Sequence, residues 1–219
     1  MDWKEYDRQL GIKTAGVKEW DGHRHYHGYE PTPYWALERL CQVYRFHPGD
    51  RVVDFGCGRG RVAFFLHHHF HVPVVGIEAD AKTYEEALLN LRAYLRQAKH
   101  APATITFEHG LAEKYQVDAA DNRFYFFNPF SSLVFQKVMG NILKSVAAHP
   151  RTVDVILFYP MPGYTVVLEG LAFELVLEIE LPEAQDPLDK FLIYRYPARR
   201  RGRVKDSDAL VPATAVGLR

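Results

Sequence analysis

The sequence predicts an α/β fold: a seven-stranded, mostly parallel sheet with helices on both faces and a C-terminal antiparallel β-hairpin. Short apolar runs alternate with stretches of helical periodicity, which is typical of a parallel sheet covered on both sides. The last two runs, Phe173–Leu181 and Lys190–Tyr196, have no helical pattern between them, which indicates a hairpin. The 219 residues suit one domain with modest additions.

Three parts are expected along the chain. Residues 1–32 are rich in aromatic residues, glycine and histidine without clear periodicity, so they predict a lead-in segment or lid. Residues 33–197 carry the alternating pattern and predict the folded domain. Residues 198–219 begin with a run of arginines and continue with small residues, which predicts a basic, disordered tail, with a specific nucleic-acid contact as the alternative.

The composition indicates which partners the protein can attract and in which cellular compartment it is expected. The 27 basic and 27 acidic side chains cancel, so no overall field attracts the chain to nucleic acid or to an anionic membrane. Cys41 and Cys57 are the only cysteines, and one lies in a glycine-rich turn, so a reducing cytoplasm is expected rather than a disulfide framework. No apolar run reaches the roughly 18 residues that a membrane span requires, so no membrane contact is expected.

The first helix is expected from Pro33 to Phe46. Thr32 is a good N-cap, proline suits the first turn, and apolar residues follow at helical spacing. A turn at residues 47–50 then leads into a short buried strand, Val52–Phe55.

The second helix follows a glycine-rich turn, from about Val62, and continues through His67–His69. Neighbouring residues on a helix lie about 100° apart, so three consecutive histidines cannot face one metal, and a partly exposed helix end is expected. The strand Val72–Ile77 follows. Asp80 then caps a long helix whose acidic residues near the start and basic residues near the end complement the helix dipole.

Residues 103–108, Phe124–Phe127 and Val153–Phe158 predict the third, fourth and fifth strands. Ser131 and Ser132 follow the fourth strand and are suited to cap a helix, because the apolar residues after them are spaced for a stripe that faces a core.

The most informative stretch is Arg51-Val-Val-Asp-Phe-Gly-Cys-Gly-Arg-Gly-Arg61. It predicts a strand, a glycine-rich turn and a helix start, where glycine backbone and N–H groups approach a ligand closely. The expected ligand is a nucleoside-type cofactor. A dinucleotide fingerprint needs Gly-x-Gly-x-x-Gly, but Arg61 stands at its last position. The observed pattern is instead Asp54-x-Gly56-x-Gly58-x-Gly60.

This pattern resembles the first motif of the class I, Rossmann-like S-adenosylmethionine-dependent methyltransferases. The resemblance implies that the glycines pass beneath S-adenosylmethionine, and that Asp54 organises the loop and its water contacts to the amino acid part. It also implies ribose contacts for Glu78, which stands 20 residues after Gly58 at the end of the second strand. The cofactor-binding residues implied here are Asp54, Gly56, Cys57, Gly58, Gly60, Glu78 and Ala79.

The resemblance extends over roughly Pro33 to Tyr196, so residues 33–197 are expected to form the methyltransferase domain. Tyr29 and Thr32 look like the lead-in of several such enzymes, including the non-SET histone lysine methyltransferases, where this region closes over the amino acid end of the cofactor. Both are therefore included as cofactor-binding residues. Many relatives have an acidic residue near the adenine, but Leu111 stands there, so backbone groups and apolar packing are expected to hold the adenine.

Asn128, Pro129 and Phe130 follow the fourth strand, at the edge where this architecture binds ligands. They resemble the Asn/Asp-Pro-Pro-aromatic signature of enzymes that methylate planar nitrogens, such as DNA adenine and release-factor glutamine methyltransferases, with Phe130 replacing the second proline. The resemblance implies that these are catalytic residues: Asn128 and a nearby carbonyl accept the hydrogens of an amino group, and Phe130 packs on its plane. A plain strand-ending turn is the alternative.

The leading interpretation is a cytoplasmic S-adenosylmethionine-dependent methyltransferase that acts on a nitrogen of a protein or small molecule. A nucleotide-dependent oxidoreductase and a noncatalytic cofactor-binding interaction protein are the alternatives. A nucleic-acid acceptor stays open but is not favoured. No metal is expected, because His23, His25 and His27 alternate in an extended segment with no cysteine or carboxylate at ligand spacing.

Overall fold

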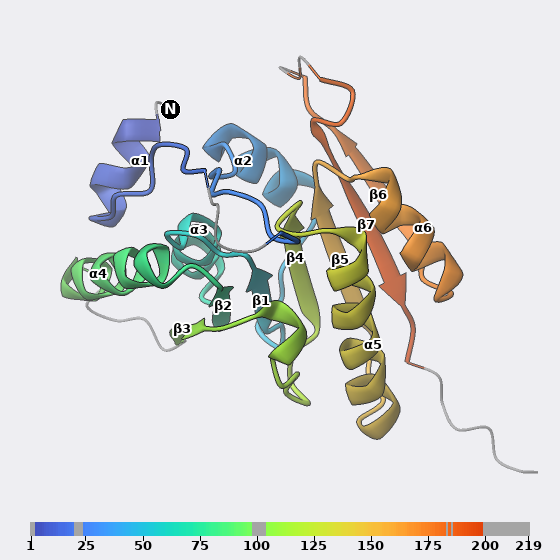
Figure 1. The fold of residues 1–219 in the computed structure, drawn as a ribbon. Coiled ribbons are helices and arrows are strands. Elements are labelled where there is room, and N and C mark those ends of the chain that lie inside the picture. Colours follow the sequence, from blue (N-terminus) through green and yellow to red (C-terminus); the bar gives the residue numbers. More distant parts are fainter. Residues whose placement is uncertain (1–2, 20–23, 98–103, 183, 185, 199–219) are drawn as a thin grey trace, which may run out of the picture.

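The structure is a computed structural model that describes residues 3–19, 24–97, 104–182, 184 and 186–198. Seven strands form one sheet in the order β3-β2-β1-β4-β5-β7-β6, as Figure 1 shows. The first five strands are parallel, and β7 is antiparallel to both β5 and β6. The predicted mixed sheet with a closing hairpin is therefore confirmed. The strands are β1 (Val52–Phe55), β2 (Val74–Glu78), β3 (Ile105–His109), β4 (Arg123–Phe127), β5 (Val153–Phe158), β6 (Glu174–Glu180) and β7 (Lys190–Tyr196).

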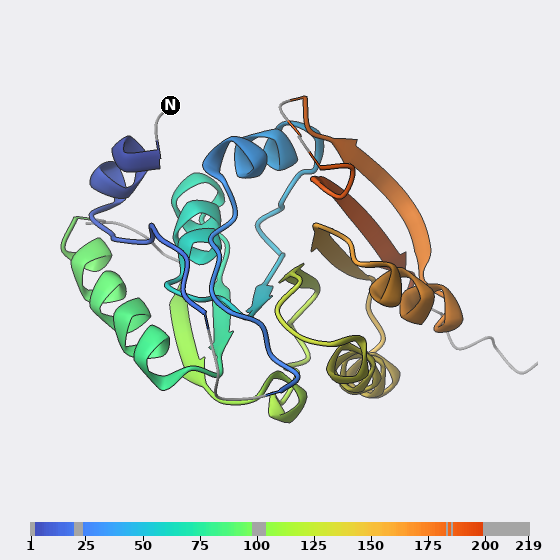
Figure 2. The same cartoon turned by 45° about the horizontal axis from the view of Figure 1, so that its top comes forward.

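Helices cover both faces of the sheet, as predicted. The first four helices lie on one face and α5 and α6 lie on the other (Figures 1 and 2). The connection between β3 and β4 contains only a single 3₁₀ turn, η1. The helical elements are α1 (Trp3–Leu10), α2 (Tyr34–Val43), α3 (Arg61–Phe70), α4 (Ala81–Gln97), η1 (Ala112–Lys114), α5 (Ser132–Ala148) and α6 (Pro162–Gly170).

Alternation along β1 decides where its one acidic side chain points. Val52 belongs to the core beneath the first four helices, whereas Val53 and Phe55 belong to the core beneath α5 and α6. Residues two apart on a strand share a face, so Asp54 lies on the side of the first four helices. Asp54 pairs in register with Tyr125 of β4, a member of the same core.

The helix α1 is a correction, because the segment before residue 33 was expected to be a lead-in without regular structure. Tyr6 and Leu10 lie one turn apart and are both buried, and the Tyr6 ring stacks on Tyr34 at 4.4 Å between centroids. Two turns of helix are too short to give a clear periodicity, so packing against α2 rather than local pattern reveals this element.

One predicted helix start was wrong. The first predicted helix begins at Tyr34 with Pro33 as its N-cap, and the Thr32 hydroxyl lies 2.9 Å from the Tyr125 hydroxyl instead of capping the helix. Ser131 is the N-cap residue of α5, as predicted, but its side chain makes no capping hydrogen bond.

The three consecutive histidines of α3 do not share one environment. His67 is buried and its Nδ1 atom lies 2.8 Å from the Tyr94 hydroxyl, whereas His68 and His69 are exposed. The expected exposed helix end therefore begins one residue later, because position 67 faces α4. His23 and residues 199–219 of the expected tail lie outside the described residues. Within the described part of the chain, no helix is both long and apolar enough to cross a membrane.

Candidate functional site

A cavity lies at the carboxyl ends of β1, β2, β3 and β4, beneath residues 24–32, which we call the strap. In Figure 2 the blue lead-in runs along this edge of the sheet toward η1. The cavity volume is about 60 Å³. The expected site residues that line it are Tyr29, Thr32, Asp54, Gly56, Cys57, Glu78, Ala79 and Pro129.

The glycine-rich turn after β1 has a backbone that other residues cannot easily adopt. Gly56, Gly58 and Gly60 have φ angles of 75°, 56° and 89°, all in the left-handed region. A Cβ atom on Gly56 would lie 2.4 Å from the side chain of Pro129, and one on Gly58 would lie 2.1 Å from the ring of Tyr29. The turn therefore needs glycine for its conformation and for close approach. Gly58 and Gly60 support the cavity without lining it.

Glu78 ends β2 and ties the glycine-rich turn to the start of α4. Its Oε2 atom accepts the N–H of Gly58 at 2.9 Å, and its Oε1 atom accepts the N–H of Asp80 at 2.8 Å. Burial raises the pKa of Glu78, against the opposing effect of these N–H donors. Each carboxylate oxygen has a second lone pair, so the side chain can still accept hydrogen bonds from a ligand in the cavity.

Asp80 caps α4, as predicted. Its Oδ1 atom accepts the N–H of Thr83 at 2.7 Å and lies 2.5 Å from the Lys18 ammonium. Burial opposes ionisation of Asp80, but the hydrogen bonds from Lys18 and Thr83 outweigh it and lower the pKa to about 2. The lead-in is thereby fastened to the helix that follows Glu78.

Asp54 is the least satisfied polar group at the site. The side chain is 3% exposed, and no described residue donates a hydrogen bond to it. Its Oδ2 atom is both buried and unpartnered. Burial, together with the charge of Glu78, raises the pKa of Asp54 to about 8. Buried polar atoms are normally hydrogen-bonded, so an orphaned carboxylate on a cavity wall indicates a binding position for a donor.

Hydrogen bonds join the strap to the residues that follow β3 and β4. The Tyr26 hydroxyl accepts the N–H of Ala112 at 2.7 Å and donates to Glu113 at 2.6 Å. The N–H of His27 donates to the Pro129 carbonyl at 3.0 Å, and the N–H of Ser131 donates to the His25 carbonyl at 2.8 Å. The strap is therefore held by hydrogen bonds on both sides of the cavity.

The Asn128-Pro129-Phe130 turn is only partly at the cavity. Pro129 lines it, whereas Asn128 has a φ of 40° and its side chain is not among the lining groups. The Asn128 carbonyl accepts a hydrogen bond of 2.7 Å from His27 Nδ1. Phe130 is fully buried in the core beneath α5 and α6, where its carbonyl accepts a hydrogen bond from the Tyr164 hydroxyl at 2.6 Å.

Arg61 is a site residue that sequence reasoning did not assign. It begins α3, lines the cavity and is only 5% exposed. Its Nε donates to the Thr14 hydroxyl at 2.7 Å and its Nη1 to the Thr32 carbonyl at 3.1 Å. Thr14 in turn binds the buried carboxylate of Asp7 through its hydroxyl and its N–H. The available signal was an arginine directly before five consecutive apolar residues at the start of a helix.

Leu111 does not line the cavity, but its neighbours Gly110 and Ala112 do. Where the chain is described, no group of three or more histidine, cysteine, aspartate or glutamate side chains is arranged to hold a metal ion.

Comparison with known proteins agrees with the fold. No protein-family model matches the chain. A protein-lysine N-methyltransferase of Saccharolobus islandicus is 34% identical over 64 residues, which are 29% of this chain and 40% of that relative. The chain thus matches less than half of the relative's length.

Two solved structures resemble nearly the whole domain. An RNA methyltransferase from Salinibacter ruber, in complex with S-adenosyl-L-homocysteine, has a TM-score of 0.52 and 17% identity, covering 79% of this chain and 97% of its own. A S-adenosylmethionine-dependent methyltransferase from Methanosarcina mazei has a TM-score of 0.56 and 11% identity, covering 70% and 95%. The chain therefore has the Rossmann-like fold of class I methyltransferases, as the glycine motif predicted.

The raised pKa of Asp54 predicts a pH-dependent penalty on folding. Between about pH 4 and pH 8 the native state keeps a proton that the unfolded chain has lost, so this group makes stability fall as pH rises. We expect Asp54→Asn to be more stable than the wild type at pH 8, by more than about 1.4 kcal/mol for a shift exceeding one pKa unit. The advantage should shrink toward zero near pH 4.

Urea unfolding of both proteins at several pH values measures this difference. A difference that does not change with pH, or a variant that is less stable at pH 8, would show that Asp54 is already satisfied in the native state.

Proposed function

We propose that the protein is a methyltransferase that uses S-adenosylmethionine and acts on a nitrogen of a protein or small molecule. The observation that carries the proposal is the orphaned carboxylate of Asp54 on the wall of a cavity built by a glycine-rich turn and Glu78. The cavity lies at the carboxyl ends of parallel strands, where this architecture binds its ligands.

The residues present fit such a cofactor. Glycines at positions 56 and 58 let Pro129 and the Tyr29 ring, two residues of the cavity wall, pack directly against the turn, so the turn forms the floor of a closely built site. Glu78 has lone pairs to accept hydrogen bonds from ribose hydroxyls. Asp54 would receive the ammonium group of the amino acid part, which supplies the donor that its Oδ2 atom lacks.

When bound, S-adenosylmethionine supplies a methyl group on a positively charged sulfur, and transfer is an in-line displacement at that carbon. The protein's task is then to position the acceptor lone pair. Positioning alone can supply up to about 7–11 kcal/mol in favourable cases. No group on the protein needs to form a covalent intermediate.

The strap must move for the cofactor to enter. The cavity of about 60 Å³ is well below the roughly 300–1,000 Å³ of small-molecule sites. The strap is held by hydrogen bonds at Tyr26, His27 and Thr32 and by packing of the Tyr26 ring against Phe130. The hydrogen bonds can exchange with water, so we interpret the described arrangement as the closed one.

The turn after β4 supports an acceptor with N–H groups. The carbonyls of Asn128 and Pro129 both accept hydrogen bonds from His27, one from Nδ1 and one from the backbone N–H. An amino group that displaced His27 would find the same two acceptors, and the Asn128 side chain would add a third. The partial likeness to a protein-lysine N-methyltransferase is in keeping with an amine acceptor.

Cofactor binding is the first test. We expect the wild type to bind S-adenosylhomocysteine with a micromolar Kd in calorimetry, and Glu78→Ala to bind at least 10-fold more weakly, because charge-assisted hydrogen bonds to the ribose are lost. Glu108→Ala is the matched control, since this exposed residue of β3 does not line the cavity, and it should bind normally.

Absence of S-adenosylhomocysteine binding by the wild type would sink the proposal. Tighter binding of NADH than of S-adenosylhomocysteine would instead favour an oxidoreductase. Cofactor binding without transfer of a labelled methyl group to any fraction of a cell extract would favour a noncatalytic interaction protein.

The role of Asn128 has its own test. Asn128→Gly removes the amide while tolerating the φ of 40°, so it avoids the backbone strain that alanine would add. We expect unchanged affinity for S-adenosylhomocysteine and loss of most turnover, measured as methyl transfer from labelled cofactor. Unchanged turnover would remove Asn128 from the reacting centre and leave it as a strand-ending turn residue.

A further inference from the structure

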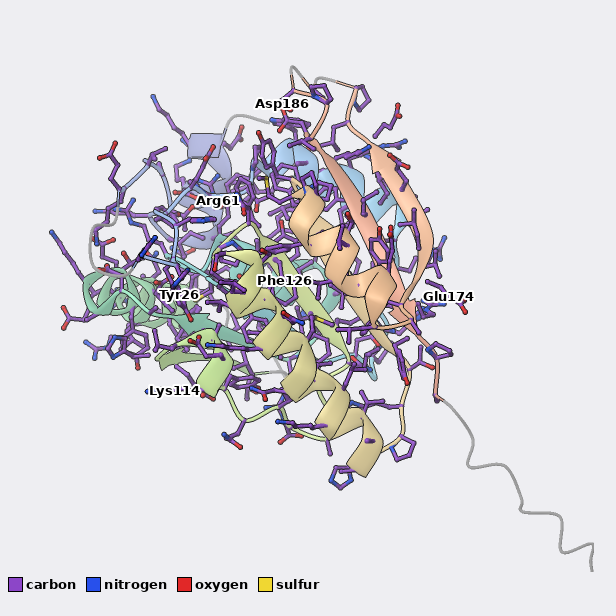
Figure 3. All side chains as sticks on the ribbon, turned by 45° about the vertical axis from the view of Figure 1, so that its right-hand side comes forward. Tyr26, Arg61, Lys114, Phe126, Glu174 and Asp186 are labelled. Carbon is purple, nitrogen blue, oxygen red and sulfur yellow. The ribbon has the colours of Figure 1, made fainter. Side chains whose placement is uncertain are left out.

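A second cavity, which we call the α1–α4 cavity, lies between α1, residues 12–15 of the lead-in and α4. Its volume is about 610 Å³, which is within the roughly 300–1,000 Å³ of small-molecule sites. It shares no lining residue with the cavity beneath the strap. In Figure 3, α1 and α4 lie on the side of the molecule that bears Arg61 and Tyr26, away from Glu174 of the C-terminal hairpin.

The α1–α4 cavity carries an excess of positive charge. Four of its lining residues are cationic and two are acidic, which gives a formal charge of +2, whereas the whole chain is neutral. These residues are Lys4, Asp7, Arg8, Lys13, Arg59 and Glu86. The protein already engages both carboxylates. Asp7 accepts hydrogen bonds from Thr14 and Tyr34, and Glu86 accepts one from Arg59 Nε at 2.6 Å.

Arg8 and Lys13 are the cations best placed to meet a ligand. Arg8 pairs with Glu5 at 3.8 Å, but both groups are exposed, and such surface pairs contribute little. The side chain of Lys13 is exposed and forms no hydrogen bond or ion pair with a residue that the structure describes; only its backbone is hydrogen-bonded, to Asn90. Both charges can therefore pair with an anion at little cost.

The rest of the wall decides what kind of anion fits. It is partly aliphatic, with Ile12, Ala15 and Leu89, and Leu89 is 60% exposed. None of the described lining residues is aromatic, so no side chain offers a platform on which a nucleic-acid base could stack. A molecule with an anionic head and an aliphatic body would pair with the cations and cover Leu89, which removes apolar surface from water.

Arg59 and Asn90 connect the α1–α4 cavity to the glycine-rich turn and to the strap. Arg59 belongs to the turn, its Nη1 donates to the Ala15 carbonyl, and its guanidinium lies 5.0 Å from the centroid of the Tyr29 ring. The Asn90 side chain accepts the N–H of Lys13 at 2.9 Å and donates to the carbonyls of Lys13 and Arg59 at 3.1 and 3.0 Å. A ligand in this cavity would therefore contact the segment that leads into the strap.

We propose that the α1–α4 cavity binds a small organic anion with an aliphatic body, and that the bound anion holds residues 12–19 against α4. The site is separate from the cavity beneath the strap, so it does not depend on the proposed function. Because residues 12–19 lead into the strap, the anion favours the closed arrangement.

Calorimetry at low ionic strength tests the site with octyl phosphate, which has both charge and chain. Inorganic phosphate supplies the charge alone, and 1-octanol supplies the chain alone. We expect octyl phosphate to bind with a Kd of about 1 mM or below, and at least about 10-fold more tightly than either of the other two. Added salt should weaken its binding.

Charge variants locate the anionic head. Arg8→Gln combined with Lys13→Gln should weaken octyl phosphate binding by at least about 10-fold, because two charge-assisted contacts are lost. The matched control combines Lys137→Gln with Lys144→Gln. It removes the same charge from exposed positions of α5, outside the α1–α4 cavity, and should bind normally.

A second pair of variants locates the chain. Leu89→Ala should weaken octyl phosphate binding without changing that of inorganic phosphate, because only the chain contacts Leu89. Leu133→Ala is the matched control, since Leu133 lies on α5 and is 61% exposed, and it should change neither affinity.

Hydrogen exchange measures whether the bound anion holds the lead-in. The N–H groups of Lys13, Thr14 and Lys18 are hydrogen-bonded in the structure, so they exchange when this segment opens. At an octyl phosphate concentration about ten times its Kd, exchange at these positions should slow about 10-fold. Exchange that stays unchanged with the ligand bound would contradict this part of the proposal.

The site itself would be ruled out if octyl phosphate bound no more tightly than inorganic phosphate or 1-octanol. Equal weakening in the α5 charge control would show general attraction to surface cations. Tighter binding of single-stranded RNA, lost in the Arg8 and Lys13 variant, would show a nucleic-acid surface instead. None of these results concerns S-adenosylhomocysteine, whose binding tests the proposed function separately.

Discussion

The carboxylate of Asp54 is enclosed by the protein without a hydrogen-bond donor, and the rest of the site is arranged around it. The alternation of β1 turns this side chain toward the first four helices, and the parallel pairing puts Asp54 between Gly76 and Tyr125, the middle residues of β2 and β4. Burial and the neighbouring Glu78 both disfavour its charge. An apolar or amide side chain there would stabilise the empty fold, so its presence is best explained by a ligand that carries a donor.

The lead-in completes the site from far away in the sequence. Asp7 holds Thr14, Thr14 and Thr32 hold Arg61, and Lys18 holds Asp80. These contacts join residues 7–32 to the first turn of α3 and to the start of α4. Arg61 and Asp54 thus reach the cavity from different elements, α3 and β1. The strap that covers the cavity also orients Arg61 through the carbonyl of Thr32. Cofactor affinity and strap closure are therefore expected to be coupled.

Most of the sheet was predictable because buried strands are short apolar runs bounded by turn residues: β1, β5 and β7 have the predicted bounds. Asp54, the glycines and Glu78 could be picked out from the sequence because the tight turn after β1 requires glycines at a fixed spacing, and Glu78 follows at the end of the next strand. Other features arise from long-range contacts that no local pattern encodes. The helix α1 depends on packing of Tyr6 against Tyr34, and the burial of Arg61 depends on Thr14 and Thr32. For the same reason, the sequence did not foretell that Phe130 would pack in the core rather than face the cavity.

The most direct test of the role of Asp54 is a crystal structure of the chain with S-adenosylhomocysteine. We expect the ammonium group within about 3.2 Å of Asp54 Oδ2, the ribose hydroxyls on Glu78, and a displaced strap. A well-occupied ligand whose amino acid end lies elsewhere, with Asp54 still unpartnered, would contradict it.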